Sequence, residues 1–160
     1  MRVLGIDPGL ERMGFGVVDK AGSKLTPIKW GLIHTPRIPL PQRLLLIEEQ
    51  LDALIQEVKP DAFATERLLF AQNKTTAMDV SKALGVALLV AARHHLPWAE
   101  YSPPEIKLSV VGTGTADKKQ VEYMVVRLLS LKEKPKPDDV ADALAIAITH
   151  ALRLGPLGVK

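Results

Sequence analysis

The chain has 160 residues, of which 47% are hydrophobic and 24% charged, and this is ordinary usage for one globular domain with its own core. It contains no cysteine, which excludes disulfides, thiolate metal sites and cysteine nucleophiles and leaves carboxylates and histidines as metal ligands. The net charge of +3 favours an anionic partner only weakly. We expect a single domain over residues 1–154 and a loose tail over residues 155–160.

Three strands are predicted at the start of the chain, over residues 2–7, 12–19 and 24–34. Asp-Pro-Gly marks the first turn, and the short connections favour an antiparallel meander. Gly14 and Gly16 indicate that backbone or ligand comes close to the second strand. Pro27 places the third strand at a sheet edge or a bulge, because proline cannot donate to a strand ladder.

Helices and strands alternate along the remainder of the chain. The predicted order is a helix over 42–58, a strand over 61–66, a polar loop over 71–75, a helix over 76–95, a strand over 97–101, a short helix over 103–111, a helix to about 130 and a last helix over 138–154. Either Thr115 or Asp117 can cap the helix that ends near 130. This order predicts an α/β domain around a mixed sheet.

Several apolar and aromatic residues are assigned to packing. The run ALGVALLVAA, residues 83–92, is too short to span a bilayer and is expected as a buried helix, so no membrane contact is expected. Trp30 and Trp98 are expected in the core. His150 is expected to pack or to cap the last helix.

Carboxylates stand at the ends of several predicted elements. Asp7 and Glu66 end two strands, and neighbouring strands would bring both side chains to one sheet edge. Asp139 and Asp142 lie on one face at the start of the last helix. Each acid has an ordinary alternative: Asp7 as a turn residue, Asp138 or Asp139 as a helix cap, and Glu66 as an ion-pair partner. Together they favour a site for two hard cations that act in phosphoryl transfer.

Four blocks of the sequence, GIDPG, ATE, IKLSVVGTGTADKKQV and DDVADALAIAITH, resemble the RuvC family of bacterial Holliday-junction resolvases. The likeness runs from residue 1 to about 153. It implies an RNase H-like fold with a five-stranded mixed sheet flanked by helices. It also implies an endodeoxyribonuclease that resolves four-way DNA junctions by symmetric paired nicks, leaving 5′-phosphates, in recombination and DNA repair. The implied cofactors are two Mg²⁺ or Mn²⁺ ions per active site.

The resemblance also assigns roles to single residues. The acidic quartet of catalytic and metal-binding residues corresponds to Asp7, Glu66, Asp139 and Asp142. The D-x-x-D spacing selects Asp139 and leaves its neighbour Asp138 as a helix cap. Lys107 and Lys118 correspond to the family's basic residues near the cut strand.

One position departs from the family pattern. The family commonly has phenylalanine three residues after the catalytic glutamate, where this chain has Leu69 followed by Phe70. Either Leu69 acts as an apolar wedge on the DNA, or Phe70 replaces the usual aromatic. Phe70 reads equally well as a core residue.

Lysines within 132–136 are expected to add non-specific phosphate contacts.

The resemblance further implies partners and a location. A two-fold junction matches a homodimer, for which residues 78–93 are the candidate interface. A RuvA–RuvB branch-migration complex is the implied protein partner, and the location is cytoplasmic and nucleoid-associated. No nucleotide cofactor is expected, since an actin-like ATP site needs a duplicated domain. A YqgF-like RNase H-fold nuclease and a catalytically silent junction-binding module remain as alternatives.

Overall fold

A five-stranded mixed sheet forms the centre of the computed structural model, which describes residues 1–69 and 74–154. The strand order is β3 (Lys24–His34), β2 (Arg12–Ala21), β1 (Arg2–Asp7), β4 (Ala62–Glu66) and β5 (Trp98–Tyr101). The first three strands pair antiparallel, whereas β4 and β5 run parallel to β1. The sheet is therefore the mixed sheet that the sequence predicts.

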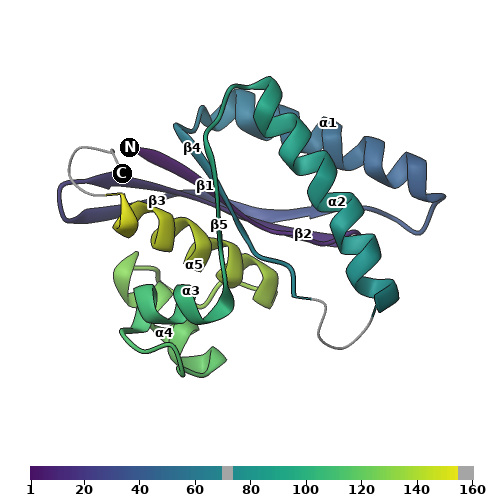
Figure 1. The fold of residues 1–160 in the computed structure, drawn as a ribbon. Coiled ribbons are helices and arrows are strands. Elements are labelled where there is room, and N and C mark those ends of the chain that lie inside the picture. The colour runs from purple at the N-terminus through teal and green to yellow at the C-terminus, as the bar shows by residue number, and fades with distance from the viewer. Residues whose placement is uncertain (70–73, 155–160) are drawn as a thin grey trace.

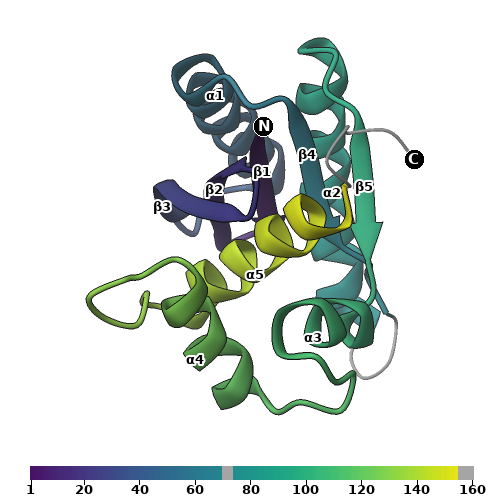
Figure 2. The same cartoon turned by 90° about the vertical axis from the view of Figure 1, so that its left-hand side faces the viewer.

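Helices cover both faces of this sheet (Figures 1 and 2). On one face lie α1 (Leu40–Val58) and α2 (Lys74–Arg93). On the other lies α5 (Asp138–Arg153), with α3 (Pro103–Val111) and α4 (Lys118–Leu128) packed against it. Each predicted helix and strand is present, and the ends differ from the predicted ones by two residues or fewer. Residues 71–73 of the predicted polar loop and the predicted tail over 155–160 lie outside the described residues, and α2 already begins at Lys74.

The edge strand β3 carries both features that Pro27 predicts. It pairs only with β2, so it lies at one border of the sheet. The register shifts between Val17 and Val18, opposite the segment that follows Pro27. The bulge removes the ladder hydrogen bond that proline cannot donate.

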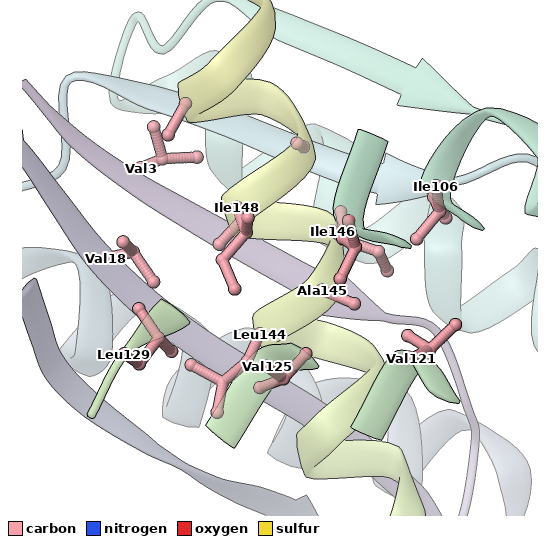
Figure 3. Packing of buried hydrophobic residues seen from close by; sticks show 14 of the residues in the cluster. Val3, Val18, Ile106, Val121, Val125, Leu129, Leu144, Ala145, Ile146 and Ile148 are labelled. Carbon is pink, nitrogen blue, oxygen red and sulfur yellow. The ribbon is translucent and has the colours of Figure 1, made fainter. Parts of the chain in front are cut away.

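Alternation along the strands divides the core into two layers. Leu4, Ile6 and Val17 are fully buried against α1 and α2. Val3 and Val18 point to the other face, where they join Leu144 and Ile148 of α5 and Val125 of α4 (Figure 3). The period of two thus also fixes the face on which each strand-end side chain lies.

Three glycines let α5 lie directly on the sheet. A Cβ atom on Gly14 would overlap the carbonyl oxygen of Asp139, and one on Gly5 would come within 2.6 Å of the amide nitrogen of Ala147. A Cβ atom on Gly16 would lie 2.7 Å from the Leu144 side chain. The close approach that the sequence predicted at Gly14 and Gly16 is therefore made by the backbone and side chains of α5.

Two packing predictions are wrong. Trp30 and Trp98 are 42% and 45% exposed, because they stand on the two edge strands, where no helix covers them fully. The helix expected to be buried, α2, buries only one side: Ala87 and Val90 are fully buried, whereas Leu89 is 51% exposed. His150, in contrast, packs as predicted, since it is 6% exposed and its Nδ1 lies 2.6 Å from the hydroxyl of Tyr101.

By length and composition alone, one helix within the described residues could cross a membrane, over Thr75–Arg93. Its inner side packs against α1 and the sheet in the same buried cluster as Leu4 and Ile6. Core helices pass the same test, so this property by itself is weak evidence for a membrane segment.

Candidate active site

Asp7 and Glu66 lie side by side at the carboxyl ends of β1 and β4. The parallel register pairs Ile6 with Thr65, which places the next residue of each strand at the same sheet edge. Asp7 follows Val3 and Gly5 on the face that α5 covers, and Glu66 follows Ala64 on that face. Two carboxylates from neighbouring strands therefore project toward α5.

The first turn of α5 brings two more carboxylates to this edge. Asp7 pairs with Gly14 across β1 and β2, and the absence of a side chain at Gly14 lets the backbone of Asp139 lie directly above it. Asp142 lies one turn further along the same helical face. The close seat of α5 on the sheet thus fixes where its acidic turn lies relative to Asp7.

Asp138 does not cap the helix, and this prediction is wrong. The cap position is held by Pro137, without a side-chain hydrogen bond. The carboxylate of Asp138 instead lies 3.1 Å from Nζ of Lys118, and this hydrogen bond lowers the pKa of Asp138. Its side chain is 57% exposed, and it contacts the first residue of α4.

Burial, and after it the crowding of negative charge, raises the pKa of three of the four acids. Burial, followed by the charges of Asp142, Glu66 and Asp139, raises the pKa of Asp7 to about 8. Burial and Asp142 also raise the pKa of Glu66, although Lys107 and Lys118 oppose the shift. Burial raises the pKa of Asp142 against the pull of Lys118. The cluster therefore holds more carboxylates than the nearby cations balance.

Lys118 and Arg12 form ion pairs with Asp142 and Asp139 of α5, and Lys134 pairs with Asp138. Nζ of Lys118 lies 3.8 Å from Asp142, and Nε of Arg12 lies 3.6 Å from Asp139. Burial opposes the charge of Lys118, yet its hydrogen bond to Asp138 and the charge of Asp142 raise the pKa of the amine overall. Lys118 is the first residue of α4, and Asp117 caps that helix in a reciprocal capping box with Gln120, which settles the choice between Thr115 and Asp117.

Three clefts meet at these side chains. The first, of about 250 Å³, contains Glu66 and Asp142 together with Lys107 and Lys118. The second, of about 420 Å³, has Asp7 and Asp139 in its wall, and the third, of about 570 Å³, has Asp139 and Asp142. A ligand that reaches all four acids would thus lie across the top of the sheet edge, between the α2 side and the α4 side.

Of the two residues predicted to contact the junction after β4, the structure describes only Leu69. Leu69, three residues after Glu66, is 59% exposed, which leaves it accessible for the contact predicted for an apolar wedge. Phe70 lies outside the described residues.

Sequence reasoning missed Arg12, which reaches Asp139. It assigned Lys134 to phosphate contacts only, whereas Lys134 also lies 3.9 Å from Asp138. The pairing of the first two strands could have located Arg12. Asp7 at the end of β1 pairs with Gly14, and Arg12 begins β2 two residues earlier, so it lies near the same sheet edge.

The donor set fits hard divalent cations. Within residues 1–69 and 74–154, no three acidic or histidine side chains are close enough to hold one metal ion in this conformation. The four carboxylates supply only oxygen ligands, which Mg²⁺ and Mn²⁺ prefer. The raised pKa values of Asp7, Glu66 and Asp142 reflect burial first and then the excess of nearby negative charge. Release of Asp139 and Asp142 from Arg12 and Lys118 would free these oxygens for a metal.

Comparisons with known proteins agree on one family. The model of the family described as crossover junction endodeoxyribonuclease RuvC matches residues 3–150. The chain is 51% identical to the RuvC protein of Brevibacillus brevis over 152 residues, covering 94% of this chain and 92% of the relative. It is similar to the solved structure of Thermus thermophilus RuvC in complex with a Holliday junction substrate, with a TM-score of 0.90 and 37% identity over 95% of this chain and 93% of that one. The fold is therefore RNase H-like, as the resemblance implied.

Proposed function

The chain belongs to the RuvC family of crossover junction endodeoxyribonucleases, and from this premise we propose that it resolves four-way DNA junctions by paired symmetric nicks. The observation that carries the proposal is the cluster of four carboxylates at one sheet edge, where burial and the neighbouring negative charges raise the pKa of Asp7 to about 8. The match to the RuvC model over 3–150 favours this reading over a YqgF-like nuclease. The location that follows is the cytoplasm, at the nucleoid.

The proposed cofactors are two Mg²⁺ or Mn²⁺ ions held by Asp7, Glu66, Asp139 and Asp142. Bound there, such ions supply positive charge and Lewis acidity for hydrolysis of a phosphodiester. The acids come from two rigid strand ends and one helix start, so they are held in place by the core rather than by loops. Burial of Asp7 and Glu66 keeps their oxygens from being fully solvated.

The basic residues have separate tasks in this proposal. Lys107 lines the cleft that holds Glu66, where its ammonium group can contact a phosphate of the cut strand. Lys118 forms ion pairs with Asp138 and Asp142 in the free protein. When Asp142 binds a metal ion instead, the ammonium group of Lys118 becomes available for a DNA phosphate. Leu69, exposed beyond Glu66, presses against the bases at the junction centre in place of the family's usual phenylalanine.

A homodimer through α2 would supply two such sites. Met78, Gly85 and Leu89 lie along the exposed side of α2, where Met78 is 55% exposed and Leu89 51%. A Cβ atom on Gly85 would meet nothing within 4 Å, so the fold of one chain does not need glycine there. Glycine inside a helix costs about 0.5–1 kcal/mol relative to alanine. Close approach of a second copy of α2 explains why it is present. A RuvA–RuvB complex is the proposed protein partner.

The decisive experiment compares a labelled four-way junction with a linear duplex of the same sequence. Paired nicks on the junction alone, present with Mg²⁺ or Mn²⁺ and absent with EDTA, support the proposal. Asp139→Asn should abolish the nicks and keep junction binding, whereas Asp138→Asn should keep the nicks, since its carboxylate faces Lys118. Tight junction binding without a cut in any metal would instead indicate a silent binding module.

A further inference from the structure

A second groove adjoins the carboxylate site, between the edge strand β3 and the loop that precedes α5. It has a volume of about 620 Å³. Its walls combine apolar, basic and small residues: Pro27, Trp30, Ser130, Leu131, Lys132, Glu133, Lys134, Pro135 and Lys136. Its lysines are among those that the sequence predicts to contact phosphates, but no role in the proposed function uses the groove itself or Trp30.

The geometry of the sheet explains why Trp30 opens into this groove. Trp30 pairs with Gly16, and directly opposite residues of an antiparallel pair point to the same face. A Cβ atom on Gly16 would touch Leu144 of α5, so Trp30 also points to the α5 face. It stands one strand further out, beyond the cover of α5, and 42% of its surface is exposed.

The charge in the groove is positive and partly uncompensated. Lys134 is 2.7 Å from Glu122, whose side chain is 8% exposed, so this pair anchors the loop to α4. Lys132 and Lys136 are exposed, and neither forms an ion pair with any residue of the described chain. Glu133 is the one acid among the lining residues. The groove thus presents two unpaired ammonium groups beside an exposed indole.

The groove is continuous with the active site. Lys134 and Lys136 line both this groove and the cleft that contains Asp139 and Asp142. A polyanion that crosses the carboxylates would therefore follow the lysines onto β3. Charge complementarity and this continuity favour DNA as the occupant.

We propose that the groove binds the sugar–phosphate backbone of the DNA arm that leaves the active site, with Lys132 and Lys136 at phosphates and Trp30 packed against the adjacent sugar. This inference rests on the proposed junction-cleaving function. It assigns the arm a path over the edge of the sheet, away from α2 and the proposed dimer interface. Lysine pairs of this kind contribute affinity that depends on salt and not on sequence.

The test measures junction affinity as a function of salt concentration. In an Asp7→Asn background, which prevents cutting, Lys132→Gln with Lys136→Gln should lower the slope of log K against log salt by about 2, since each lost phosphate contact removes about 0.9. The matched control replaces Lys24 and Lys59 by glutamine, which removes the same charge outside the groove and should leave the slope nearly unchanged. Glu133→Gln should strengthen binding.

A second readout follows Trp30 itself. In a Trp98→Phe background Trp30 is the only tryptophan. Its fluorescence should change when the junction binds, and this change should be smaller when Lys132 and Lys136 are replaced by glutamine. An unchanged salt slope together with an unchanged emission would overturn the inference. If the wild-type protein still nicks junctions in that case, the proposed function stands without it; if it neither binds nor nicks them, the proposed function fails.

Discussion

Replacement of Asp7 by asparagine should stabilise the metal-free protein at neutral pH. The pKa of Asp7 is raised to about 8 by burial and by Asp142, Glu66 and Asp139, from an ordinary value of 3.8. Between these two values the unfolded chain loses its proton while the folded one keeps it. Stability therefore falls as pH rises from about 4 toward 8. Asparagine keeps the shape of the side chain and removes this dependence.

The size of the effect follows from the shift. Each unit of pH between the ordinary pKa of 3.8 and pH 7 weakens the fold by up to about 1.36 kcal/mol, which gives an upper limit of about 4 kcal/mol at pH 7. For a domain of this size, about 1 kcal/mol shifts Tm by roughly 2–4 °C. Asp7→Asn should thus raise Tm by at most roughly 8–16 °C at pH 7 and leave it nearly unchanged at pH 4.

Thermal unfolding in EDTA at pH 4, 5, 6 and 7 measures this difference. Asp138→Asn is the matched control, because the hydrogen bond to Lys118 lowers the pKa of Asp138 and loss of its charge should not stabilise the fold. Saturating Mg²⁺ should reduce or reverse the advantage of Asp7→Asn, since a ligand stabilises the form that binds it better. A Tm for Asp7→Asn equal to or below that of the wild type in EDTA at pH 7 would refute the electrostatic reasoning.

Three further outcomes are expected. Calorimetry should show that Mg²⁺ affinity rises by up to about tenfold per pH unit below pH 8, with release of a proton, and levels off above it; a flat profile would contradict the raised pKa of Asp7. Gly14→Ala should lower stability by about 1–3 kcal/mol and abolish cleavage, because the new methyl group overlaps the Asp139 carbonyl, whereas Gly85→Ala should fold normally. Leu89→Glu should sediment as a monomer at micromolar concentration, and the control Leu152→Glu as a dimer; equal sedimentation of the two would exclude α2 as the interface.

The sequence predicted the elements well because local signals agree with the tertiary contacts. Pro27 predicted an edge strand with a bulge, and β3 has both. Asp117 predicted a helix start, and it forms a capping box with Gln120. The strand-end positions of Asp7 and Glu66 predicted one shared sheet edge, because parallel neighbours end together. Each of these inferences needs only a few residues of chain.

Features that depend on distant contacts could not be predicted in this way. Asp138 looked like a helix cap, but Lys118, on another helix, gives its carboxylate a better partner. The tryptophans looked like core residues, yet burial depends on which strands become edges. Arg12 beside Asp139 depends on where α5 crosses the sheet. Local pattern carries no information on any of these distances.

The close packing of α5 on the sheet links the stability of the fold to the chemistry of the carboxylates at the sheet edge. Gly5 and Gly14 leave no side chain under the helix, so the acids of its first turn lie close to Asp7. This closeness destabilises the metal-free protein through like charge, and the buried contacts of α5 on the sheet offset that cost. A larger residue at Gly14 would push the first turn of α5 away from Asp7. The repulsion between the acids would then fall, and so would the affinity of the site for a divalent cation. The same spacing that lets cations bind therefore destabilises this edge of the sheet when no metal is bound.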